Sequence, residues 1–167
     1  MTKMQEYVIV IGGSKSHVPF IECSQKLGYQ TIVFDIDPNC MGAQISNTFY
    51  KISTYDIDKI IFMCNEINKD KKVIGIFTYC SAFEPLFAVA KITEKLGLRS
   101  FSVESVRIAN NKGLMKQCFS ASGLNTPDCA ITSHVSEAND FINRSNRPVI
   151  MKPLSGSQGS KGVALID

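Results

Sequence analysis

The chain has 167 residues, of which 44% are hydrophobic and 20% are charged, and its formal net charge is +3. This composition indicates a globular protein of one domain, or of one domain and part of a second. The weak, scattered positive charge argues against a nucleic-acid partner or an anionic membrane surface, and no apolar run approaches the ~18 residues of a membrane span. The N-terminus lacks an apolar signal core, so we expect a cytoplasmic protein.

Six cysteines are spread along the chain without a C-x-x-C pair. This spacing matches neither a zinc site nor a disulfide framework, and most of the cysteines lie in apolar stretches. We therefore expect reduced, buried thiols and no metal site. Of the two histidines, His17 is expected to be a polar surface residue at the start of a helix, and His134 has no partner at motif spacing. Neither is assigned a catalytic role.

The first part of the chain alternates short apolar runs with segments of helical periodicity. The apolar, β-branched runs are typical of strands that are buried on both faces, and the helical segments begin at proline or aspartate and end at glycine or lysine. Strands are expected over 6–11, 31–34, 50–53 and 73–79, and helices from Pro19 to Gly28, from Asp56 to Lys69–Lys72 and from Pro85 to Gly97.

This order, β-α-β-(β)-α-β-α over residues 1–97, predicts a parallel sheet with helices on both faces. Right-handed crossovers then give a doubly wound, Rossmann-like α/β layout. Sheets of this kind bind ligands beyond the carboxyl ends of their strands. In this chain those ends are Gly12-Gly13-Ser14, Asp35-Ile36-Asp37 and Tyr79-Cys80-Ser81.

The turn after the first strand, Gly12-Gly13-Ser14-Lys15-Ser16-His17, matches half of a dinucleotide fingerprint. The third glycine is replaced, but Asp35 lies at about the right distance downstream to meet a ribose hydroxyl. Three interpretations stay open: a tight turn into the helix, a small-ligand site at the strand ends, and an NAD site. Asp35 and Asp37 could be paired carboxylates, but we expect one of them to face a ligand and the other to cap the turn before Pro38.

The second part of the chain has shorter elements and ends in a hairpin. We expect a connector helix over 101–110, a helix over 112–122 that ends at Gly123, a short strand over 130–132, a helix over 136–144, and a closing hairpin whose first strand carries Lys152 and whose second is 162–166.

The loop of this hairpin is rich in small residues. Glycines stand three apart, serines lie between them, and lysines flank the loop. Small residues let backbone N–H groups approach an anion, and serine hydroxyls add donors. The loop has about eight residues where an ordinary hairpin needs about two to five. It therefore predicts a cover over a triphosphate, and the alternative is a mobile hairpin tip.

The stretches "NKGLMKQCFSASGLNTPDCAI" and "RPVIMKPLSGSQGSKGVALI" resemble the first part of an ATP-grasp module. That family includes biotin carboxylase, the carbamoyl phosphate synthetase large chain and the carboxylate–amine ligases of purine synthesis. Its pattern is an Asn/Asp-Lys pair, a helix that ends in Gly, a Pro, and then an apolar strand with Lys-Pro and a Gly/Ser-rich loop. "LGYQTIVFDIDP" and "GIFTYCSAFEP" resemble the domain that usually precedes such a module.

The resemblance implies a Rossmann-like pre-ATP-grasp domain over 1–97, a connector over 98–110 and an incomplete α+β ATP-grasp subdomain over 111–167. It implies that the first domain helps to hold the acceptor substrate, with Gly12, Gly13 and Asp35 near it. It also implies ATP contacts from the lysine of the Asn-Lys pair, from the strand lysine and from the glycine-rich loop. These residues are Lys112, Lys152, Ser155, Gly156, Ser157, Gly159, Ser160, Lys161 and Gly162.

The parent enzyme implied is a magnesium-dependent ligase. It would activate a carboxylate or bicarbonate with ATP and pass the acyl phosphate to an amine or similar nucleophile. The family's adenine hinge, its magnesium ligands and a basic residue for the transition state follow the glycine hairpin, so we expect this chain to be an N-terminal fragment without turnover of its own. A homo-oligomer is compatible with the resemblance. The alternative is a dinucleotide-binding or small-ligand module without catalysis.

Overall fold

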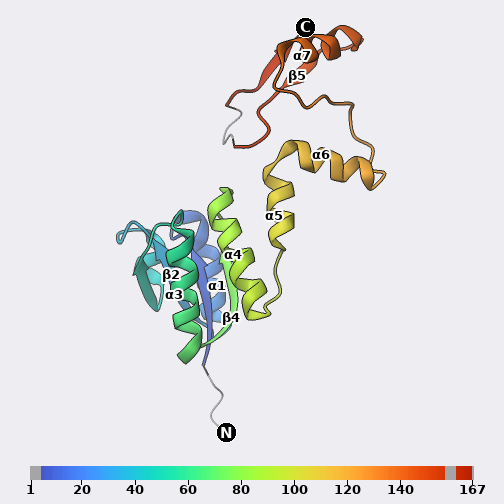
Figure 1. Ribbon diagram of the computed structural model, residues 1–167. Coiled ribbons are helices and arrows are strands. Elements are labelled where there is room, and N and C mark those ends of the chain that lie inside the picture. The colour runs from blue at the N-terminus through green and yellow to red at the C-terminus, as the bar shows by residue number, and fades with distance from the viewer. Residues whose placement is uncertain (1–4, 157–160, 167) are drawn as a thin grey trace. The chain divides into compact units, whose positions relative to one another are not determined.

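The computed structural model describes residues 5–156 and 161–166 and divides into two compact units (Figure 1). Unit 1 is Met1–Val106 and unit 2 is Arg107–Asp167. Helix α5 (Val103–Asn110) crosses the division. Within the described residues, no helix is both long and apolar enough to cross a membrane.

Unit 1 is a four-stranded parallel sheet with helices between the strands. The strand order is β3-β2-β1-β4, and β1 pairs with β2 and β4 on either side. The prediction of a doubly wound sheet with adjacent parallel strands is therefore confirmed. Its elements are β1 (Glu6–Ile11), the 3-10 turn η1 (Lys15–His17), α1 (Val18–Lys26), β2 (Gln30–Asp35), α2 (Met41–Ile45), β3 (Thr48–Lys51), α3 (Ile57–Asp70), β4 (Lys72–Thr78) and α4 (Phe83–Leu96).

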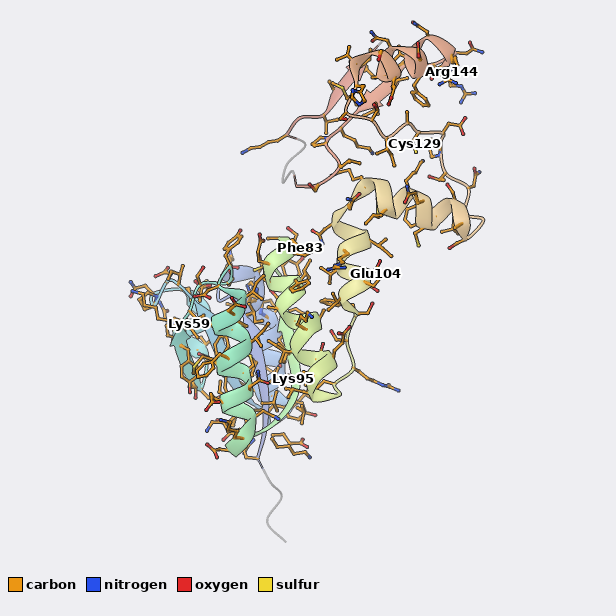
Figure 2. All side chains as sticks on the ribbon, in the orientation of Figure 1. Lys59, Phe83, Lys95, Glu104, Cys129 and Arg144 are labelled. Carbon is orange, nitrogen blue, oxygen red and sulfur yellow. The ribbon has the colours of Figure 1, made fainter. Side chains whose placement is uncertain are left out.

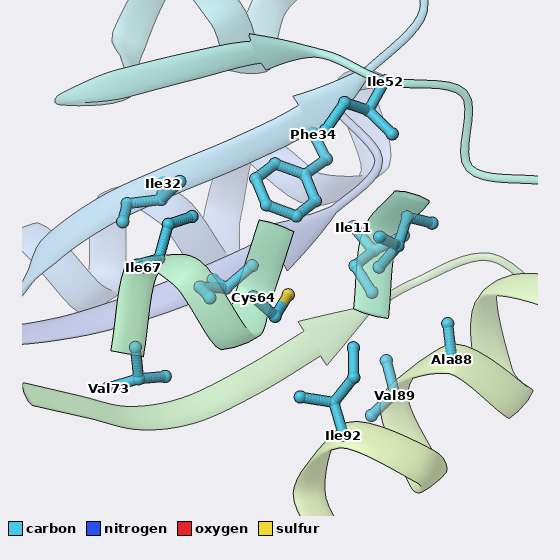
Figure 3. Close-up of a cluster of buried hydrophobic side chains, with 12 residues drawn as sticks. Ile11, Ile32, Phe34, Ile52, Cys64, Ile67, Val73, Ala88, Val89 and Ile92 are labelled. Atoms are coloured by element: carbon cyan, nitrogen blue, oxygen red, sulfur yellow. The ribbon is translucent and has the colours of Figure 1, made fainter. Parts of the chain in front are cut away.

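The core of unit 1 lies on both faces of the sheet, because successive strand residues point to opposite sides. Ile9 and Ile11 belong to one buried cluster, and Val8 and Val10 belong to another. The larger cluster includes side chains of α3 and α4, and Figure 3 shows Cys64 and Ile92 reaching it from these helices. The smaller one includes Ile21 of α1.

The helix ends in unit 1 follow local chemistry. Asp56 caps α3, and its side chain accepts a hydrogen bond from the Lys59 amide at 3.2 Å. Pro19 lies in the first turn of α1, where its missing N–H costs no hydrogen bond. Gly97 ends α4 with φ +65°, a conformation that glycine adopts without steric cost.

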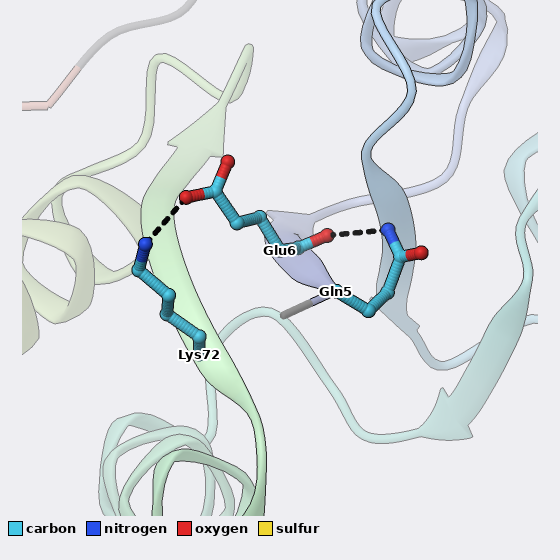
Figure 4. Close-up of polar contacts among 3 residues, drawn as sticks. All are labelled: Gln5, Glu6 and Lys72. Carbon is cyan, nitrogen blue, oxygen red and sulfur yellow. Dashed lines mark hydrogen bonds and ion pairs between the residues drawn. The ribbon is translucent and has the colours of Figure 1, made fainter. Parts of the chain in front are cut away.

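A polar cluster lies at the amino-terminal edge of the sheet, opposite the expected ligand edge. Lys72 Nζ pairs with Glu6 Oε1 at 2.6 Å, and Gln5 Nε2 donates to the Glu6 carbonyl at 3.3 Å (Figure 4). Gln5 Nε2 also donates to the Gly28 carbonyl at 3.1 Å. These contacts are partly exposed to solvent, so they contribute little to stability.

The described residues of unit 2 form the end of α5, two further helices and a two-stranded hairpin. These are α6 (Lys112–Ala121), α7 (Val135–Arg144), β5 (Val149–Met151) and β6 (Ala164–Ile166). β5 and β6 are antiparallel, with Val149 opposite Ile166, so the predicted hairpin is confirmed. All the large buried hydrophobic side chains of the described residues lie in unit 1, while several in unit 2, among them Ile150 and Leu165, are exposed.

Three expectations from the sequence were wrong, and one element was missed. Residues 130–132 form no strand, and β3 runs from Thr48 to Lys51 instead of over 50–53. The short helix α2 was not foreseen. Lys152 follows β5 instead of lying on it, because that strand ends at Met151.

The expectation of buried thiols was also wrong in most cases. All six cysteines are free, but Cys23, Cys118 and Cys129 are exposed, and Figure 2 labels Cys129 on an irregular segment. Only Cys64 is buried, and burial raises the pKa of its thiol to about 12. The Cys64 thiol is therefore unreactive at neutral pH, because the thiolate is the nucleophilic form.

Candidate functional site

Two groups of residues singled out from the sequence lie in different units. The carboxyl edge of the parallel sheet in unit 1 carries the glycine turn and the aspartates that follow β2. In unit 2, the start of α6 lies beside the beginning of the glycine-rich loop.

Asp35 ties the first two strands together at the carboxyl edge. Its Oδ2 accepts a hydrogen bond from the Gly13 amide at 2.7 Å, and its Oδ1 accepts one from the Asp37 amide at 3.0 Å. Asp37 Oδ1 in turn accepts from the Asn39 amide at 2.9 Å, as expected for a residue that caps the turn. The structure therefore brings Asp35 to Gly13, and both carboxylate oxygens already have backbone partners.

The two glycines of this turn are explained by close packing. Gly12 has φ +105°, and a Cβ there would lie 2.5 Å from the imidazole of His17. A Cβ on Gly13 would lie 2.4 Å from Cys40 Sγ. The Gly13 carbonyl also accepts a hydrogen bond from the Gly42 amide at 2.7 Å. The glycines are needed for the tight turn into the helix, which was the first of the three interpretations.

His17 is a residue of this edge that the sequence interpretation placed wrongly on the surface. Its side chain is buried between the glycine turn and the connection after β4, where its Nε2 accepts a hydrogen bond from the Tyr79 amide at 3.1 Å. Burial lowers the pKa of its imidazole, while the charge of Asp35 raises it in part. Only the place of His17 directly after a strand–glycine turn could have signalled this role.

In unit 2, Asn111 starts α6 and faces the hairpin. Its Oδ1 accepts hydrogen bonds from the Gly113 and Leu114 amides at 3.0 Å each, so it is the N-cap of the helix. Asn111 also forms an isolated antiparallel bridge with Ser155. The Lys112 amide donates to the Leu154 carbonyl at 2.8 Å. The Asn-Lys pair is thus attached to the start of the loop.

The packing around Gly113 keeps these segments close. A Cβ on Gly113 would lie 3.0 Å from both Ile131 Cδ1 and Leu154 Cδ2, which is tighter than most real contacts. A larger residue after the Asn-Lys pair would therefore require the Ile131 and Leu154 side chains to shift. At the other end of the loop, Gly162 has φ +73°, and its Cβ direction points toward Pro153 at 3.3 Å.

The ammonium group of Lys112 lies at the entrance of the loop. Its Nζ donates to the Gly156 carbonyl at 3.3 Å. Lys152 and Lys161 are exposed. Ser157, Gly159 and Ser160, which were also expected to contact phosphate, lie outside the described residues. An ammonium group beside a small-residue backbone is suited to phosphate oxygens, which accept several charge-assisted hydrogen bonds.

Metal-ligating side chains do not gather in threes within the described residues. These residues contain no group of three or more His, Cys, Asp or Glu side chains that could hold a metal ion.

The fold resembles those of several solved enzymes. One of them is the biotin carboxylase domain of 2-oxoglutarate carboxylase from Hydrogenobacter thermophilus, solved in complex with MgADP, ADP and bicarbonate. The match covers 98% of this chain and 38% of that chain, with TM-score 0.79 and 18% identity. N5-carboxyaminoimidazole synthetase from Staphylococcus aureus, complexed with ADP, matches 99% of this chain and 42% of its own with TM-score 0.75 and 18% identity. The chain has the fold of the N-terminal part of ATP-grasp enzymes.

An L-amino acid ligase from Bacillus licheniformis is a further structure of this fold, with TM-score 0.69 and 19% identity over 99% of this chain and 40% of the ligase. The chain thus spans about two fifths of the length of these ATP-grasp structures. No family model and no curated protein matches the sequence. The resemblance inferred from the Asn-Lys pair and the glycine-rich loop is confirmed at the level of the fold.

Proposed function

We propose that this chain supplies the front part of an ATP-dependent ligase of the ATP-grasp fold. The ligase activates a carboxylate or bicarbonate as an acyl phosphate, and an amine or similar nucleophile then attacks the acyl carbon. The fold supports this proposal, because enzymes of the same fold were solved with ADP, MgADP and bicarbonate. Magnesium and the transition-state residues would come from the remainder of the ligase.

The attachment of the Asn-Lys pair to the loop is the observation that carries the proposal. The Lys112 amide is bonded to Leu154, and the Lys112 ammonium group lies 3.3 Å from the Gly156 carbonyl. This places a positive charge beside Gly156, where a Cβ would meet nothing within 4 Å. In the proposed complex, Lys112 exchanges its carbonyl partner for a phosphate oxygen, and Lys152 and the loop from Ser155 to Gly162 hold the remaining phosphate oxygens.

The role of unit 1 in this proposal is to hold the acceptor. Gly12, Gly13 and Asp35 lie together at the carboxyl edge of the sheet, where ligands of doubly wound folds bind. Because the oxygens of Asp35 accept backbone hydrogen bonds, its contribution is to shape the turn and to supply negative charge. The alternative function, a dinucleotide or small-ligand module, uses this same edge without unit 2.

The two functions are separated by where a nucleotide binds. We expect millimolar MgATP to shift the backbone NMR signals of Lys112, Ser155 and Gly156 in the 167-residue chain, and NAD to leave those of Gly12 and Gly13 unchanged. Lys112→Ala should remove the ATP-induced shifts. Lys95→Ala, in the last turn of α4 in unit 1 (Figure 2), should keep them. Shifts at Gly12 and Gly13 with NAD, and none in unit 2 with ATP, would favour the dinucleotide module.

In the complete ligase, the lysine after β5 gives a quantitative test. Lys152→Ala should weaken ATP binding by about 1.5–3 kcal/mol, the usual contribution of a hydrogen bond to a charged group. This corresponds to a dissociation constant roughly 10- to 100-fold higher. An unchanged ATP affinity in a folded Lys152→Ala enzyme would remove this residue from the proposed site.

A further inference from the structure

His17 lies between two connections at the carboxyl edge of the sheet in unit 1. His17 is 2% exposed, and its ring packs so closely on Gly12 that a Cβ on Gly12 would have no space. On one side is the glycine turn after β1, and on the other is the connection from β4 to α4, which contains Tyr79 and Cys80. The two connections are 62 residues apart in the sequence at the His17–Tyr79 contact.

The hydrogen bonds of the ring define its protonation state. The Tyr79 backbone amide can only donate, so Nε2 of His17 must carry a free electron pair to accept its hydrogen at 3.1 Å. The neutral ring then has its proton on Nδ1, which lies 2.9 Å from Ser14 Oγ and donates to it. A proton on Nε2 would face the amide N–H and break the bond to Tyr79.

The groups that favour a positive charge on the ring are Asp35 and the backbone of Ile11 and Ser14, and together they do not offset its burial. Cys80 Sγ lies 3.9 Å from Nε2, and the Tyr79 ring meets the imidazole edge-on at a centroid distance of 6.3 Å. Asp35 of β2 is the carboxylate that acts on His17, and its oxygens already accept hydrogen bonds from the Gly13 and Asp37 amides. Burial therefore dominates and lowers the pKa of His17.

We propose that His17 is a positioning residue whose neutral ring holds the β4–α4 connection on the glycine turn, and that proton uptake releases this connection. The released segment begins at Tyr79, whose side chain is 67% exposed, and leads into Phe83 at the start of α4 (Figure 2). The carboxyl edge of the sheet thus opens in acid. This device belongs to unit 1 and does not depend on the nucleotide site proposed in unit 2.

The direction of the pH effect follows from linkage. The pKa of His17 in the closed state is below its ordinary value of 6.5, so the open state binds the proton more tightly. The full stability of the closed edge is present above pH 6.5 and is lost as the pH falls toward the lowered pKa. Because one proton is taken up, the opening constant should rise about tenfold per pH unit within this window.

Hydrogen exchange of the Tyr79 amide measures this opening in the 167-residue chain. Between pH 8 and pH 5, the protection factor, corrected for the intrinsic exchange rate, should be constant well above pH 6.5 and should fall below it, by at most about tenfold per unit, until the pH reaches the lowered pKa of His17. His17→Gln, whose side-chain oxygen can accept from the Tyr79 amide but does not titrate, should keep the protection and lose its pH dependence. His17→Leu should lose the protection at every pH.

His134→Gln is the matched control, because it removes the other histidine of the chain, which is exposed at the start of α7. It should leave the pH dependence of the Tyr79 amide unchanged. A flat profile in the wild-type chain, or the same slope in His17→Gln, would overturn the proposal. If the His17 variants do not fold, the ring ¹⁵N signals of wild-type His17 test the proposal instead. Titration of Nε2 outside the pH range in which the Tyr79 amide opens would refute the coupling between the two.

Discussion

Two glycines far apart in the sequence meet at the turn after β1. A Cβ on Gly42 would lie 2.7 Å from the Gly13 Cα and 3.0 Å from its carbonyl oxygen, so it would meet backbone and not a flexible side chain. Backbone atoms cannot move aside as the end of a flexible side chain can. The Gly42 amide also donates a hydrogen bond to the Gly13 carbonyl at 2.7 Å. The contact therefore sets how closely α2 approaches the turn.

We expect Gly42→Ala to destabilise the chain by about 1–3 kcal/mol, the usual cost of overpacking, despite the better helix propensity of alanine. Gly75→Ala is the matched control, because the Cβ direction of Gly75 in β4 meets nothing within 4 Å. Urea unfolding of both variants measures the free-energy difference. If the two variants are equally stable, the close approach of Gly42 to Gly13 does not limit the packing.

At the scale of elements, local signals were reliable where the backbone needs one particular residue. The start of α3 was predicted from Asp56, and its side chain does accept a hydrogen bond from the Lys59 amide. By contrast, α2 has no side-chain cap and contains a glycine, which disfavours a helix. Residues 130–132 carry a strand-like apolar pattern, but no described strand pairs with them.

The cap of α3 can be tested directly. Asp56→Ala should lower the free energy of unfolding by about 0.5–2 kcal/mol, because an amide at the first turn loses its acceptor. Asp56→Asn keeps an acceptor oxygen at the same place and should recover most of the loss. Thermal and urea unfolding of the three proteins provide the measurement. An Asp56→Asn variant as unstable as Asp56→Ala would show that the effect comes from charge at the helix end and not from the cap.

At the scale of the whole molecule, the apolar core is unevenly distributed. The large buried hydrophobic side chains of the described residues lie between Val8 and Val106, and therefore in unit 1. In unit 2, residues such as Leu165 and Ile150 of the hairpin are exposed. Since burial of apolar surface is the main source of stability, the two units should differ in how readily their hydrogen bonds open.

Hydrogen exchange should therefore be slowest in β1 and fastest in unit 2. We expect the amides of β1 to be protected at least about 100-fold more strongly than those of β5 and β6, because opening of the hairpin exposes little new apolar surface. Rates corrected for intrinsic exchange, measured above pH 7 to keep His17 neutral, provide the comparison. Equal protection in the two units would mean that they unfold as one cooperative body.

The amino-acid sequence by itself determined the parallel sheet, most helix boundaries and the hairpin. These follow from apolar strands, caps and glycine ends that act within a few neighbouring residues. It also indicated the Asn-Lys pair and the glycine-rich loop. Only the tertiary structure placed Lys112 beside Gly156, made Gly42 meet Gly13 and buried His17 against Tyr79. These contacts join residues far apart in the chain, and no local pattern contains them, because they arise only when strands and helices pack.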